Sequence, residues 1–116
     1  MKTLIIINDP PYGTERMYNA LRLAGGLVKV ENHQITVFLM GDAVSGAKAG
    51  QKTPDGYYNV ERMLRRIVNG QGQVLLCGTC LDARAIAEGE LLAGTRRSTM
   101  EELTAATVAA DKVLVF

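Results

Sequence analysis

Two cysteines three positions apart, Cys77 and Cys80, are the residues of this 116-residue chain best suited to chemistry. Cys77 ends the apolar run Val74–Cys77, and Cys80 follows it where a helix is predicted to begin. Backbone amides at a helix start stabilise a nearby thiolate, so its pKa falls below the ordinary thiol value of about 8.5. The pair is therefore predicted to contain a thiol that reacts as a nucleophile near neutral pH.

Other roles for the two cysteines stay open on residue types alone. Cys77 is also compatible with inert packing, because a free cysteine behaves as a small hydrophobic side chain. A structural zinc site needs four Cys or His ligands, and one chain supplies only these two and His33, so we predict no metal site. Thiol–disulfide exchange of the thioredoxin type also uses Cys-x-x-Cys at a helix start. However, none of the three prolines follows the motif, where thioredoxins place a cis-proline.

Arg84 is the third residue predicted for the catalytic site. It lies four positions after Cys80, so in a promptly starting helix its guanidinium would approach the same end as the thiols. A cation there would stabilise a thiolate further. No cofactor is predicted, because Gly41–Lys48 resembles a phosphate-binding loop only loosely and Gly70–Gly72 lacks the third glycine of a dinucleotide fingerprint.

The elements that must position these residues begin with four apolar runs of strand length. They are Leu4–Ile7, Ile35–Met40, Val74–Cys77 and Val113–Phe116. Continuous rather than alternating apolar runs are typical of strands that are covered on both faces. They predict a parallel sheet between two layers of helices.

Helical patterns separate the first three runs. Thr14 is predicted to cap a helix that reaches Val28, and Gly41–Lys48 suits a short helix. The segment Tyr57–Asn69 is predicted as a helix with Glu61 on its polar face. The loop Gly46–Gly56, rich in Gly and Pro, is expected to be mobile.

Further elements are predicted after the cysteines. A helix is expected to begin near Leu81 and fade at Gly89. Ser98 and Glu101 have capping-box spacing for a last helix, and Thr95–Arg97 suits a short edge strand. The alternation predicts an α/β fold, a three-layer α/β/α sandwich with a mainly parallel sheet of four to five strands, formed by residues 1–116 as a single domain.

Composition excludes several function classes. Thirteen Lys and Arg against twelve Asp and Glu give a net charge of +1, which argues against a nucleic-acid partner held by phosphate contacts. No apolar window has the roughly 20 residues of a membrane span, so no membrane association is expected. Two cysteines without an export signal favour the reducing cytoplasm.

The carboxyl edge of the sheet is where function is expected, because ligands of open parallel sheets bind outside the carboxyl ends of the strands. Three segments should meet there: Asn8–Gly13, Gly41–Ala47 and Cys77–Cys80.

The chain resembles the DsrE/DsrF-like family, and in particular its small YchN-type members, over nearly its whole length. The segments that carry the resemblance are Asn8–Gly13, Phe38–Val44, Gly50–Lys52, Cys77–Arg84 and Ala109–Leu114. The most specific of them is the Cys-x-x-Cys segment with Asp82 and Arg84 following.

The resemblance implies a three-layer α/β domain that forms oligomers and carries sulfur as a cysteine persulfide. In those relatives the carrier cysteine is followed seven residues later by a basic residue and then glycine. Here Cys77 matches the carrier, Arg84 the basic residue, and Ala85 stands in the place of the glycine. Cys80 corresponds to an extra thiol of the YchN-type branch.

On these grounds the expected function is intracellular sulfur transfer, with Cys77 as the sulfur-accepting thiolate and Cys80 as a resolving thiol. The expected partners are sulfur donor and acceptor proteins and further copies of the chain, with Tyr57, Tyr58 and Met100 as exposed contact residues. The alternatives are a non-enzymatic interaction or regulatory module and a thiol–disulfide redox protein.

Overall fold

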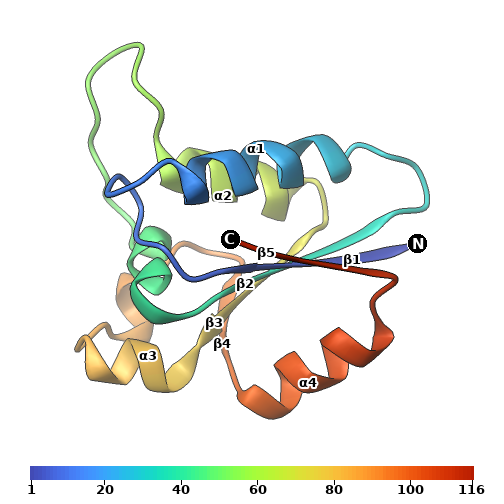
Figure 1. Ribbon diagram of the computed structural model, residues 1–116. Coiled ribbons are helices and arrows are strands. Elements are labelled where there is room, and N and C mark those ends of the chain that lie inside the picture. The colour runs from blue at the N-terminus through green and yellow to red at the C-terminus, as the bar shows by residue number, and fades with distance from the viewer.

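A five-stranded parallel sheet forms the centre of the computed structural model, which describes residues 1–116 (Figure 1). Its strands are β1 (Lys2–Ile7), β2 (Gln34–Leu39), β3 (Gln73–Cys77), β4 (Thr95–Ser98) and β5 (Lys112–Val115). They lie in the order β4-β3-β2-β1-β5, and all neighbours are parallel. The four apolar runs and the short edge strand are thus confirmed as strands.

Helices cover both faces of this sheet. α1 (Arg16–Leu27) and α2 (Val60–Asn69) lie on one face, and α4 (Met100–Ala109) lies on the other (Figure 1). The chain steps from β1 to β4 in one direction across the sheet and then returns past β1 to β5. Connections between parallel strands are right-handed, so their helices cover one face while the chain moves one way across the sheet and the other face when it moves back. The predicted three-layer α/β/α sandwich is confirmed.

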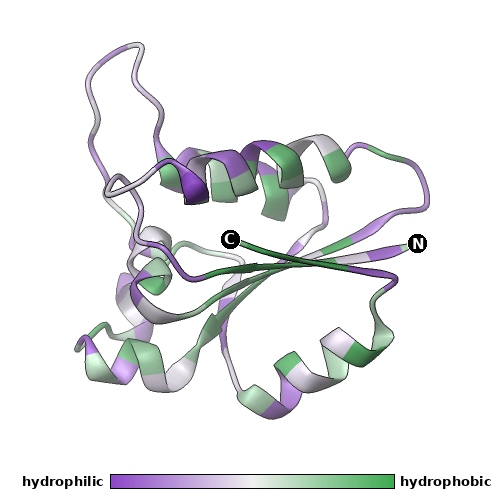
Figure 2. Ribbon diagram, in the orientation of Figure 1, coloured by the Kyte–Doolittle hydropathy of each residue, from purple (hydrophilic) through white to green (hydrophobic).

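Two apolar clusters hold the layers together. The larger contains 19 buried residues, including Ile5, Val37 and Leu64. The smaller consists of Leu4, Phe38, Leu75 and Leu103, the last from α4. Figure 2 shows the central strands β2 and β3 and most of β1 as hydrophobic, as burial on both faces requires. No helix is long and apolar enough to cross a membrane.

Helix starts differ from the sequence predictions by one or a few residues. α1 begins at Arg16 after Glu15, one residue later than a Thr14 cap would place it; the Thr14 hydroxyl donates to Asp9 and accepts the Arg16 amide at 3.3 Å. α4 is capped by Thr99, whose hydroxyl accepts from the Glu102 amide. The predicted capping pair of Ser98 and Glu101 is wrong because Ser98 ends β4.

The predicted helix from Leu81 to Gly89 is also wrong. α3 (Gly78–Ala83) begins directly after β3, and a separate 3-10 turn, η2 (Glu88–Glu90), follows. The break occurs at Ala85, whose φ of 54° lies in the left-handed region and ends the helix. The segment after β2 forms a 3-10 helix, η1 (Gly41–Ala47), where a short helix was predicted.

Candidate active site

Three chain segments meet around the cysteines at the carboxyl edge of the sheet. Cys77 is the last residue of β3 and Cys80 lies one turn into α3. The Gly41 amide at the start of η1 donates to the Cys80 sulfur at 3.2 Å. A Cβ added at Gly41 would lie 3.4 Å from the carbonyl oxygen of Asn8, the residue after β1. The predicted meeting of the three strand-end segments is what the structure shows.

The Cys77 thiol is half-buried and surrounded by hydrogen-bond donors. Thr79 Oγ1 lies 3.3 Å from its sulfur. Burial raises the pKa of Cys77, but hydrogen bonds from the Cys80 side chain, the Thr79 hydroxyl and the backbone amides of both residues outweigh burial, and the net shift is downward. Cys77 is therefore the thiol of the pair that ionises first.

The Cys80 thiol is shifted in the opposite direction. Burial raises its pKa, and so do the hydrogen bond and the charge that it shares with Cys77. The Gly41 amide and the charge of Arg84 offset this only in part. When the pair loses one proton, the arrangement favours the charge on Cys77, which then accepts a hydrogen bond from a protonated Cys80.

Arg84 interacts with Cys80 and η1 rather than with the Cys77 thiol. Its Nε and Nη2 donate to Asp42 Oδ1 at 2.9 and 2.7 Å, and its Nη1 donates to the Cys80 carbonyl at 3.0 Å. Among the causes that shift the two thiol pKa values, Arg84 acts on Cys80. The structure thus makes Arg84 a positioning residue that ties α3 to η1.

Arg97 is the cation beside Cys77, and the sequence reasoning missed it. A Cβ added at Gly78 would lie 2.8 Å from Arg97 Nε, so the guanidinium covers the residue after Cys77. Arg97 donates to both carboxylate oxygens of Asp82 at 2.7 Å. These hydrogen bonds raise the pKa of Arg97 most, and the negative charge of Cys77 adds to them. The edge strand that was expected at Thr95–Arg97 is the signal that could have located it.

Ala85 adopts the conformation that a glycine would provide. The Ile86 amide donates to the Leu81 carbonyl at 3.0 Å and the Ala85 amide to the Asp82 carbonyl at 3.1 Å. Together with the positive φ of Ala85, this pattern is a Schellman motif that ends α3. The Cβ of alanine makes this left-handed conformation unfavourable.

Replacing Ala85 by glycine is expected to raise the free energy of unfolding by about 1 kcal/mol, because glycine removes that strain. The measurement is urea denaturation followed by circular dichroism. Gln71→Gly is a matched control, since Gln71 has a φ of 70° at the corresponding position after α2, far along the chain from the thiols. A loss of stability in Ala85→Gly would contradict the Schellman assignment.

His33 and the cysteines lie at opposite ends of the sheet. His33 hydrogen-bonds Thr3 at 2.8 Å beside the first residues of β1 and β2, whereas Cys77 ends β3. No group of three or more His, Cys, Asp or Glu side chains is placed to hold a metal ion. The two thiols lie at the carboxyl edge, away from His33.

A half-exposed dithiol at the carboxyl edge of a parallel α/β/α sandwich defines a small thiol-bearing α/β domain. The DsrE/DsrF-like family model matches residues 1–116, and the chain belongs to this family, which is associated with sulfur relay.

Similar proteins cover the whole chain. Protein YchN of Escherichia coli K12 is 42% identical over 116 residues, covering 99% of this chain and 98% of that protein. The uncharacterized protein MJ0989 of Methanocaldococcus jannaschii is 34% identical over 116 residues, covering 100% of both. The crystal structure of the Escherichia coli ychN protein superposes with a TM-score of 0.94 over 99% of this chain and 98% of that one.

Proposed function

We propose that this protein is a persulfide carrier in which Cys77 accepts sulfane sulfur from a donor and passes it to an acceptor thiol. The observation that supports this most is the hydrogen-bonded environment of Cys77, which lowers its pKa while leaving the sulfur half-exposed. A thiolate that is both ionised and accessible is the species that attacks another sulfur atom.

Loading is a displacement at sulfur. The Cys77 thiolate attacks the outer sulfur of a donor persulfide R–S–SH, the new Cys77 S–S bond forms, and the donor S–S bond breaks. The products are Cys77–S–SH and the donor thiolate R–S⁻, so the sulfane sulfur carries its proton across and no oxidant is needed.

Unloading has two possible routes. An acceptor thiolate can attack the outer sulfur and release Cys77 as a thiolate, which returns the carrier to its starting state. Alternatively, Cys80 can lose its proton and attack the Cys77 sulfur, which expels HS⁻ and forms a Cys77–Cys80 disulfide that an external dithiol must reduce. The raised pKa of Cys80 slows the second route and preserves the persulfide for the acceptor.

Thiol–disulfide exchange is the second candidate function. The hydrogen bond between the Cys77 and Cys80 side chains favours it, because it places the two sulfur atoms next to each other. The Cys77–Cys80 disulfide that forms when Cys80 expels HS⁻ is the same product that a dithiol reductase forms when it reduces a substrate disulfide.

Assembly with further copies of the chain is part of the proposal. Tyr57 and Met100 are 53% and 58% exposed, whereas Tyr58 is half-buried among other tyrosines. The strongest support comes from α4 and β5, where Val108 and Val115 are 83% and 65% exposed. β5 is an apolar edge strand without the arginines that protect β4, so a second copy is proposed to cover it. A monomeric sedimentation coefficient would contradict this.

Alkylation by iodoacetamide as a function of pH tests the proposed reactivity. The pKa of Cys77 is lowered, so its thiolate forms at lower pH than that of a free thiol. Its alkylation rate is therefore expected to reach a plateau at lower pH as well. Cys80 has a raised pKa and should react only in more alkaline solution. Peptide mass spectrometry after timed quenching measures both rates separately.

The Cys80→Ser variant is the control, because a single remaining thiol gives one unambiguous pH profile. Serine at position 80 keeps a donor for the Cys77 thiolate, so the early plateau should persist. If Cys77 alkylated slowly at every pH until the protein unfolds, the carrier proposal would be rejected and a non-enzymatic interaction or regulatory module would be the better description.

A further inference from the structure

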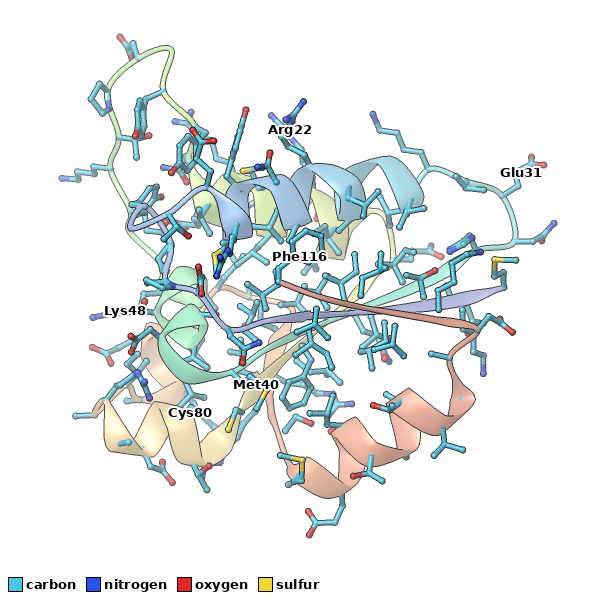
Figure 3. All side chains as sticks on the ribbon, viewed as in Figure 1. Arg22, Glu31, Met40, Lys48, Cys80 and Phe116 are labelled. Atoms are coloured by element: carbon cyan, nitrogen blue, oxygen red, sulfur yellow. The ribbon has the colours of Figure 1, made fainter.

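A cavity of about 650 Å³ lies in the groove between α1 and α2. Leu21, Val28 and Met63 supply its apolar lining, and Gly25 and Gly26 leave the middle of the groove free of side chains. Figure 3 shows Arg22 on the outer side of α1, directed away from the sheet, while Cys80 lies beyond the opposite side of it in this view. The groove is therefore separate from the dithiol site.

The groove carries positive charge that no acidic side chain neutralises. Arg22, Lys29 and Arg66 line the cavity, and Arg62 lines its extension toward the start of α2. None of these four forms an ion pair, although six other Lys or Arg side chains do. No Asp or Glu lines either part of the groove. In a chain of net charge +1, this concentration of free cations marks a site for an anion.

A tyrosine cluster forms the other end of the groove. An adjoining hollow of about 230 Å³ beside these tyrosines shares Arg22, Met63 and Arg66 with the main cavity. Tyr57 stacks on Tyr58 with ring centroids 4.8 Å apart, and Tyr57 is 53% exposed. An exposed aromatic ring beside free arginines suits a planar ring that bears phosphate groups.

We propose that the α1/α2 groove binds a purine nucleoside diphosphate, with its phosphates on Arg22, Lys29 and Arg66 and its base on Tyr57. The cavity volume lies within the range of sites that hold ligands of this size. Guanidinium groups pair with phosphate oxygens in bidentate geometry, which explains arginines at two of the three positions. The site neither uses nor depends on the thiols of the proposed carrier function.

Isothermal titration calorimetry of the full chain with ADP, adenosine and inorganic pyrophosphate tests the proposal. ADP is expected to bind at least about tenfold more tightly than adenosine or pyrophosphate alone, because it engages both the cations and the ring platform. Absence of ADP binding, or equal affinity for ADP and pyrophosphate, would overturn the proposal.

Variants separate a built site from general charge attraction. Arg66→Glu is expected to weaken ADP binding at least about tenfold. Lys2→Glu makes the same charge change on β1, outside the groove, and should leave affinity within about twofold. If both variants lost ADP affinity equally, the attraction would depend only on net charge, and the proposed site would be overturned.

Gly25→Gln provides a test that does not remove a cation. A Cβ at Gly25 meets nothing within 4 Å, so the variant should fold with unchanged or higher thermal stability while its side chain obstructs the cavity. ADP binding should be lost, and Cys77→Ser should bind ADP as the wild type does. Unchanged binding in a folded Gly25→Gln protein would overturn the proposed location.

Discussion

Cys77→Ser is expected to abolish loading with sulfane sulfur, whereas Cys80→Ser is expected to load fully and to retain the sulfur for longer. The first substitution removes the thiolate that forms the new S–S bond. The second removes the thiol that would expel HS⁻, yet serine still offers a hydroxyl donor to Cys77. The expected loss in Cys77→Ser is complete because the pKa of Cys80, the other thiol at this edge of the sheet, is raised.

Intact mass spectrometry after incubation with a small-molecule persulfide donor measures the result. The wild type and Cys80→Ser should each gain the mass of one sulfur atom, and the gain should disappear on treatment with a dithiol. Cys77→Ser should remain at its own mass. Equal sulfur loading of Cys77→Ser and the wild type would rule out Cys77 as the carrier. Circular dichroism of Cys77→Ser shows whether the variant is folded, so that a loss of loading is not caused by unfolding.

A faster loss of loaded sulfur from the wild type than from Cys80→Ser would assign the resolving role to Cys80. The rate should rise with pH, since Cys80 must lose its proton before it attacks and its pKa is raised. The two functions considered for the pair then become consecutive steps on one pair of thiols.

The sequence predicts the position of the site better than its detailed electrostatics. An apolar run that ends in Cys77 must bring it to the carboxyl edge of a parallel sheet, whatever the surrounding loops do. The hydrogen-bond partners of Arg84 depend on how η1 packs against α3, because Asp42 is 42 residues away along the chain. Contacts of that kind follow from tertiary packing and have no local pattern.

Strands are predicted more securely than helix ends for a similar reason. The runs around Ile5, Val37 and Leu76 are apolar because both faces of each strand are buried, a requirement that extends over several residues. A helix start depends on one side chain and its neighbours. Thr14 and Ser98 each lie one residue before the residue that caps the helix, Glu15 and Thr99 respectively, and their hydroxyls donate to the carboxylates of Asp9 and Glu102.

Glu61 shows how tertiary structure overrides a helical pattern. Its spacing places it on the polar face of α2, but only 9% of the residue is exposed. The chain between η1 and α2 folds back over the helix start, and the Glu61 carboxylate accepts the amides of Gly50 and Gln51, both at 2.9 Å. The base of the loop that was expected to be mobile is thereby attached to α2. Arg65 donates to the same carboxylate at 3.0 Å.

Glu61→Ala is therefore expected to lower the free energy of unfolding by about 2–4 kcal/mol, because it leaves two partly buried amides without an acceptor. Glu61→Gln keeps one acceptor oxygen and should cost clearly less. Arg65→Met removes only the exposed partner of the ion pair and should cost at most about 1 kcal/mol. Urea denaturation of the three variants ranks these effects.

Limited trypsin digestion adds a local measurement to the same variants. Lys52 lies in this loop, and cleavage after it requires the loop to leave the surface. In Glu61→Ala cleavage at Lys52 should accelerate more than the loss of global stability explains, because the two amide contacts hold the loop and not the sheet. If Glu61→Ala were no less stable than Arg65→Met and were cleaved at the same rate, the carboxylate would not be what holds the loop.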